Sequence, residues 1–97
     1  MFELEITDSA LGDLDYFKKF EQRLILDEIE TQLFVEPLTQ TRNRKPLRPN
    51  DLSEWELRID KYRVFYDVDI ESNTVTVKAV GWKEHNRLFI RGKEFVL

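Results

Sequence analysis

The stretch "LRIDKYRVFYDVD", residues 57–69, decides the fold. Apolar and polar residues alternate on both sides of a central Asp-Lys pair, a pattern typical of two half-buried strands joined by a tight turn. If the turn closes symmetrically, Ile59 pairs with Tyr62 and Leu57 pairs with Val64. These four side chains then share one face of a β-hairpin, because side chains directly opposite on paired strands point to the same side.

The other face of this hairpin carries charge. The same register places Arg58 opposite Arg63 and Glu56 opposite Phe65. Like charges directly across two strands destabilise a sheet. Either the arginines turn toward water or nearby glutamates, or an anion lies between them, since guanidinium groups bind phosphate in bidentate fashion. Phe65 either stacks on a nucleobase or covers the edge of the C-terminal helix predicted below.

The flanking sequence extends this hairpin into an α+β fold. Residues 2–7, "FELEIT", alternate like a half-buried strand. Apolar residues at helical spacing over 8–35 predict two antiparallel helices with a break near Phe20, since a single helix of about 42 Å is too long for this domain. Residues 73–80 predict another strand, followed by a short helix ending near Gly92. The expected order is β-α-α-β-β-β(-α), with both helices packed on one face of a small, mostly antiparallel sheet.

Length and composition narrow the possible classes of protein. The 97 residues are expected to form a single domain, 1–97. With no cysteine and one histidine, a disulfide framework, a thiolate metal site and a zinc site are not expected, and no cofactor is implied. No apolar run approaches the roughly 20 residues needed to span a bilayer, and the acidic N-terminus is unlike a signal peptide. The expected location is the cytoplasm, away from the membrane.

Charge is divided unevenly along the chain. Residues 1–39 hold ten acidic and three basic side chains, whereas residues 40–97 hold twelve basic and nine acidic ones. The loop "TRNRKPLRPN", residues 41–50, gathers four cations: Arg42, Arg44, Lys45 and Arg48. Two interpretations remain open. The loop contacts RNA backbone phosphates, or it is a solvated loop paired with the acidic helices.

Two segments resemble a known family across nearly the whole chain. Residues 46–69, "PLRPNDLSEWELRIDKYRVFYDVD", followed by residues 79–90, "AVGWKEHNRLFI", resemble the RelE/ParE superfamily of bacterial type II toxin–antitoxin toxins. The resemblance implies the β-α-α-β-β-β domain described above. It also implies one of two activities. RelE-type members cut messenger RNA in the ribosome without a metal, whereas ParE-type members inhibit DNA gyrase, and an antitoxin holds both silent.

The resemblance assigns roles to residues of the hairpin. Arg63 matches the family arginine that stabilises the phosphate, and Arg58 is placed to assist it. Two positions that carry lysines in the RelE branch are Glu54 and Glu56 here. Some relatives use a glutamate–arginine–histidine set instead, with the glutamate in the loop where this chain has Lys45. The general base is therefore Glu56, Glu54 or Lys45.

The segment after the last predicted strand carries the other family positions. Lys83 corresponds to a basic residue, and the tyrosine of RelE falls at Phe89, which has no proton to donate. His85 lies near the histidine of the other branch, and its ordinary pKa near 6.5 suits a general acid. Trp82 either belongs to the core or stacks on a base of the RNA.

The expected function is therefore that of a RelE-type toxin. Such a protein is a metal-free, ribosome-dependent endoribonuclease in which the ribose 2′-hydroxyl attacks the phosphate and leaves a 2′,3′-cyclic phosphate. Its partners would be an antitoxin, the ribosome and messenger RNA. The alternatives are a non-enzymatic, ParE-like inhibitor of DNA gyrase and a degenerate toxin that only binds its antitoxin.

Overall fold

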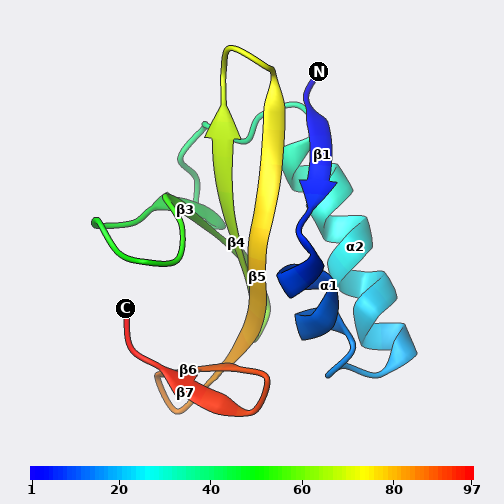
Figure 1. Ribbon diagram of the computed structural model, residues 1–97, viewed down its shortest axis with the longest axis vertical. Helices are drawn as coiled ribbons and strands as arrows, with labels where there is room; N and C mark the ends of the chain where they lie inside the picture. The colour runs from blue at the N-terminus through cyan, green and yellow to red at the C-terminus, as the bar shows by residue number, and fades with distance from the viewer.

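The computed structural model describes residues 1–97 as two helices and seven strands (Figure 1). In chain order these are β1 (Glu3–Ile6), α1 (Asp8–Leu14), α2 (Lys19–Leu33), β2 (Arg44–Pro46), β3 (Trp55–Ile59), β4 (Tyr62–Asp69), β5 (Thr74–Glu84), β6 (Arg87–Ile90) and β7 (Lys93–Phe95). This order confirms the predicted α+β class, in which two helices cover one face of a sheet. It adds β2 before the central hairpin and β6 and β7 after it.

All seven strands belong to one sheet. Six follow the order β2-β3-β4-β5-β6-β7 with antiparallel neighbours, and β1 pairs in parallel with β5. The long β5 serves two regions, since its residues 74–77 pair with β1 and its residues 82–84 pair with β6. Figure 1 shows β6 and β7 crossing the lower end of β5, on the side away from the helices.

Local hydrogen bonds set the helix boundaries. The Thr7 hydroxyl accepts a hydrogen bond from the backbone N–H of Ala10 at 3.1 Å and caps α1. At the start of α2 the Glu21 carboxylate accepts one from the backbone N–H of Lys18 at 3.0 Å. The predicted break between the helices is confirmed, and it falls at residues 15–18. Neither helix has the length and apolar character needed to cross a membrane.

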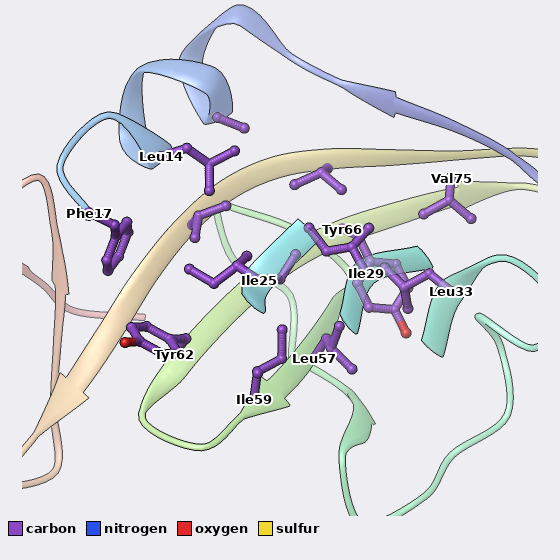
Figure 2. Close-up of a cluster of buried hydrophobic side chains, with 14 residues drawn as sticks. Leu14, Phe17, Ile25, Ile29, Leu33, Leu57, Ile59, Tyr62, Tyr66 and Val75 are labelled. Atoms are coloured by element: carbon purple, nitrogen blue, oxygen red, sulfur yellow. The ribbon is translucent and has the colours of Figure 1, made fainter. Parts of the chain in front are cut away.

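The helices and the sheet enclose a main core of 14 buried residues. Ile25, Ile29 and Leu33 lie four residues apart on α2 and are at most 1% exposed. Figure 2 shows this stripe beside Leu57 of β3 and Val75 of β5. Burying each such side chain stabilises the fold by about 1.5–3 kcal/mol.

The β3–β4 hairpin has the register that the sequence predicts. Its paired positions are Ile59–Tyr62, Leu57–Val64, Arg58–Arg63 and Glu56–Phe65. Asp60 closes the turn with a φ of 53°, in the left-handed region that aspartate tolerates better than most residues. The helix-facing row enters the main core, and the charged row lies on the opposite face.

The predicted C-terminal helix is wrong, because residues 87–95 form the hairpin of β6 and β7. Two tight turns produce it. His85 and Asn86 have φ values of 52° and 65°, and Arg91 and Gly92 have values of 52° and 76°. Such left-handed pairs match the twist of antiparallel strands, so the chain reverses twice instead of continuing as a helix.

This hairpin covers a small core on the face away from the helices. Phe65, Ala79 and Leu88 are its buried members, and Ile90 and Phe95 of the hairpin pack against them together with Leu47 and Leu52 of the loop before β3. Phe65 is fully buried. Phe65 was expected to stack on a nucleobase or to cover the edge of a C-terminal helix; it packs instead under the hairpin that stands in place of that helix.

Candidate functional site

The sheet register gathers charged residues on the face away from the helices. Glu56, Arg58 and Arg63, which we call the charged cluster, come from the central hairpin. Lys45 pairs with Glu56 from the β2 side, and Gly81 pairs with Arg63 from the β5 side. Because side chains directly across a sheet share a face, β2, β3 and β4 converge on the cluster.

Arg63 and Glu56 form an ion pair inside this cluster. The distance between Arg63 Nε and Glu56 Oε1 is 3.2 Å, and the two side chains are 11% and 5% exposed. Arg63 Nη1 also donates hydrogen bonds to the carbonyl oxygens of Asp60, at 2.7 Å, and Tyr62, at 2.9 Å. The arginine therefore resolves its repulsion from Arg58 by contacting a neighbouring glutamate, one of the two outcomes that the sequence left open.

The pairing within the charged cluster is incomplete. Glu56 Oε1, Arg63 Nε and Arg58 Nε are buried, and none has a hydrogen-bond partner of good geometry. Burial lowers the pKa of the Arg63 guanidinium and Arg58 adds to that shift, whereas the negative charges of Glu56 and Asp60 oppose it. The Nε groups of Arg58 and Arg63 are hydrogen-bond donors without a partner of good geometry, so the cluster has free donors of the kind that bind an anion.

The hairpin of β6 and β7 packs closely on Gly81, the neighbour of Arg63 on β5. Gly81 lies next to Arg63, and a methyl group on Gly81 would collide with the carbonyl oxygen of Phe89 and crowd the Ile90 side chain. Phe65, which pairs with Glu56, is buried in the small core under the same hairpin. The glycine at this position thus permits a close approach of backbone to sheet.

Lys83 and His85 follow Gly81 along β5 and into the next turn. Lys83 alternates with Gly81 and therefore points to the face of the charged cluster. His85 is exposed in the β5–β6 turn and takes part in none of the side-chain hydrogen bonds or ion pairs of the structure. At about 3.3 Å per residue it lies about 13 Å along the chain from Gly81.

Trp82 is directed away from the charged cluster. Its ring packs edge-on against Phe17 at 5.6 Å and stacks on Phe89 at 5.8 Å, on the helix-covered side of the sheet. Of the two interpretations of Trp82, the structure agrees with the core residue, and the ring lies on the opposite face from Arg63 because successive residues of a strand point to opposite faces. The family tyrosine position, Phe89, lies on that side as well.

Arg44 is a structural residue rather than an RNA contact. Its guanidinium donates to the carbonyl oxygen of Thr39 at 3.0 Å and to the backbone and side-chain oxygens of Gln32 at 3.0 and 2.7 Å. It also lies 3.8 Å from Glu36, and its side chain is 9% exposed. The expected RNA contact is corrected at this position, because the chain itself occupies the arginine and attaches the loop to α2.

The other cations of the loop remain on the surface. Arg42, Lys45 and Arg48 are exposed, and none forms an ion pair. Among the three possible bases, Glu56 is the one in contact with Arg63. Glu54 is exposed and lies immediately before β3. No group of three or more acidic or histidine side chains is placed to hold a metal ion.

Comparison with known proteins gives one family and several similar structures. The family described as "ParE toxin of type II toxin-antitoxin system, parDE" matches residues 4–86. A chain of the RelBE2 toxin–antitoxin complex from Mycobacterium tuberculosis is 27% identical, with a TM-score of 0.73 over 84% of this chain and 98% of that chain. No curated protein matches the sequence.

Two further structures share the fold at lower identity. A chain of the archaeal RelE–RelB complex from Pyrococcus horikoshii is 19% identical, with a TM-score of 0.68 over 87% of this chain and 97% of that chain. The YoeB/ParE toxin from Agrobacterium tumefaciens is 16% identical, with a TM-score of 0.65 over 86% of this chain and all of that chain.

Proposed function

Because the chain belongs to the family of ParE toxins of type II toxin–antitoxin systems, we propose that it acts as a metal-free endoribonuclease of the RelE type. It would cleave messenger RNA on the ribosome, in the cytoplasm, and a cognate antitoxin would hold it inactive. Similar folds in RelBE2 and RelE–RelB toxin–antitoxin complexes support the antitoxin as a partner.

The contact between Glu56 and Arg63 is the observation that carries this proposal. Cleavage needs a base to remove the proton of the 2′-hydroxyl, and the resulting oxygen attacks the adjacent phosphorus. Negative charge then grows on the phosphate, where a guanidinium stabilises it. Glu56 is the base, and Arg63, assisted by Arg58 and Lys83, stabilises the phosphate.

The remaining steps complete the proton balance. The 5′-oxygen of the next nucleotide leaves as its bond to phosphorus breaks, and it takes a proton from a general acid, for which His85 is the candidate. The products are a 2′,3′-cyclic phosphate and a 5′-hydroxyl. Arg42, Lys45 and Arg48 contact the RNA backbone, which orients the substrate without selecting its sequence.

A second function rests on a different observation. The Glu56 and Arg63 side chains are only 5% and 11% exposed, whereas a nuclease must bring a phosphate into contact with them. A ParE-like protein that inhibits DNA gyrase by binding needs no such access. In that case the charged cluster is purely structural. A degenerate toxin that only binds its antitoxin is a third outcome.

Induced expression followed by mapping of transcript ends separates these functions. The nuclease predicts rapid arrest of translation and new 5′-hydroxyl ends in messenger RNA. Arg63→Lys keeps the charge but loses the planar fork, and we expect it to reduce cleavage at least about tenfold. Arg87→Lys, at an exposed hairpin position, is the matched control and should retain full activity.

Two results would count against the nuclease. Filamentous cells with a DNA-damage response and intact transcripts would indicate gyrase inhibition. Normal growth under strong expression of the folded protein would indicate a degenerate toxin. Thermal unfolding of each purified variant separates loss of activity from loss of structure.

A further inference from the structure

Arg91, at the tip of the β6–β7 hairpin, reaches across to α1. Its Nε donates to Asp13 Oδ1 at 2.7 Å, and its Nη2 donates to the carbonyl oxygen of Ser9 at 2.8 Å. Asp13 is 2% exposed, and its other oxygen accepts a hydrogen bond from the backbone N–H of Val80 at 2.9 Å. A buried carboxylate thus connects the helix, the central sheet and the hairpin.

Gly12 lies directly against the guanidinium group of Arg91. A methyl group at Gly12 would collide with the Arg91 guanidinium. Glycine inside a helix costs up to about 1 kcal/mol relative to alanine. Its presence within α1 is explained by this close approach.

Elsewhere the hairpin is attached by a short stretch of sheet pairing, by the stacking of Phe89 on Trp82 and by the small core. β7 pairs only with β6, and β6 pairs with β5 only over residues 82–84. The small core beneath it has three buried residues, against 14 in the main core. Segments with little buried apolar area open locally at lower free energy than the whole protein unfolds.

We propose that the β6–β7 hairpin is a hinged cover over the charged cluster, and that the Asp13–Arg91 pair is the latch that holds it closed. Opening breaks the latch at the tip, the pairing and stacking of Phe89 on Trp82 and the packing on Phe65, while the sheet pairing at Lys83 and Glu84 acts as the hinge. It uncovers Gly81 and its neighbour Arg63. The cover explains how an anion site can be almost fully buried and still be reached by a ligand.

Amide hydrogen exchange tests the latch in the full chain. In Arg91→Met, exchange over residues 87–95 should quicken about tenfold or more, since a charge-assisted hydrogen bond is lost, while β4 keeps its rates. Arg87→Met is the matched control, because Arg87 lies on the same hairpin, 3.9 Å from Glu94, and makes no bond to α1. Equal rates in the two variants, or faster exchange throughout β4, would overturn the proposal.

Gly12→Ala provides a second test that leaves every charge in place. Alanine favours the helix but displaces Arg91, so the hairpin should again exchange faster while α1 does not. Labelling with phenylglyoxal, located by mass spectrometry, should rise at Arg63 in both latch variants and stay at the wild-type level in Arg87→Met. Unchanged labelling of Arg63 in both latch variants would overturn the proposal.

These measurements do not depend on the proposed nuclease activity. The cover is a property of the fold, and exchange and labelling report it directly. Faster exchange and labelling in variants of a protein that never cleaves RNA would support the cover and reject the nuclease. Normal cleavage of RNA with no change in exchange or labelling would support the nuclease and reject the cover.

Discussion

The two faces of the sheet are closed in different ways. On one face the helices bury a continuous apolar core of 14 residues. On the other, a short hairpin covers three buried apolar residues and a charged cluster whose polar atoms are incompletely paired. The first arrangement supplies most of the stability. The second face retains buried charges. Apolar residues of similar volume can often replace such charges without loss of stability, so we expect function on this face.

A matched pair of core substitutions tests this division with the largest expected effect. Leu57→Ala, in the main core, should lower the free energy of unfolding by about 3–5 kcal/mol. Leu88→Ala, under the hairpin, should lower it by only about 1–2 kcal/mol, because the cover can relax around the smaller side chain. Urea denaturation of both variants provides the measurement. Equal decreases in the free energy of unfolding for the two variants would show that the two faces contribute equally to stability.

Removing one member of the ion pair should have the next largest effect. Glu56→Ala leaves Arg63 buried without its counter-charge, and we expect a loss of about 3 kcal/mol. The double variant Glu56→Leu with Arg63→Met should recover most of that loss, since apolar groups of similar size need no partner. Chemical denaturation measures both. A double variant as unstable as the single one would show that the charges stabilise the fold.

Two adjacent residues of β2 allow a comparison across the sheet. Arg44→Met removes buried hydrogen bonds on the helix-covered face and should lower stability by about 2 kcal/mol. Lys45→Met, on the other face, should change stability by less than about 0.5 kcal/mol. It should instead reduce the salt dependence of RNA binding by about 0.7 in the slope of log K against log salt. Binding titrations at several salt concentrations measure this slope. A slope equal to that of the wild type would exclude a phosphate contact by Lys45.

The smallest expected effect concerns the edge of the helix-covered face. The Tyr62 hydroxyl donates a hydrogen bond to Glu21. This bond lowers the pKa of Glu21 from its ordinary 4.5, and burial, with Glu21 nearby, raises the pKa of Tyr62 from 10.0 to about 12. The contribution of Glu21 to the stability of the fold is therefore present above pH 4.5 and is lost as the pH falls through the lowered pKa of its carboxyl group. The Tyr62 contribution is present below pH 10 and lost as pH rises toward 12.

Tyr62→Phe removes both contributions at once. The stability difference from the wild type should be constant near neutral pH and should shrink on acidification and in strong alkali. Denaturation curves across this range provide the test. A difference that stays the same from neutral pH down to pH 3 would exclude the link to Glu21.

The regular parts of the fold were predictable because their signals are local. Alternation over residues 57–69 fixed the register of the central hairpin, including Arg58 opposite Arg63. The C-terminal hairpin was missed because two turns with left-handed residues, beginning at His85 and Arg91, were interpreted as parts of a helix. Residues 88–90, Leu-Phe-Ile, form a continuous apolar run whose pattern does not distinguish a strand from a short helix.

The site was predictable only where neighbours in sequence are neighbours in space. Arg63 and Glu56 follow from the hairpin register, but the 3.2 Å ion pair between them and their burial do not follow from the alternation alone. Arg44 resembles the rest of its loop in sequence and differs only because α2 supplies its partners. The role of Asp13 was hidden as well, since its partner lies 78 residues away. A glycine within an otherwise helical segment, Gly12, was the available signal.

The most direct test asks whether the Glu56–Arg63 pair is a working site or a structural ion pair. The double variant Glu56→Leu with Arg63→Met should fold with near wild-type stability, and toxicity on induced expression should be measured beside it. If the pair is the site, the folded double variant is harmless and leaves transcripts uncut. A folded double variant that remains as toxic as the wild type would contradict this account.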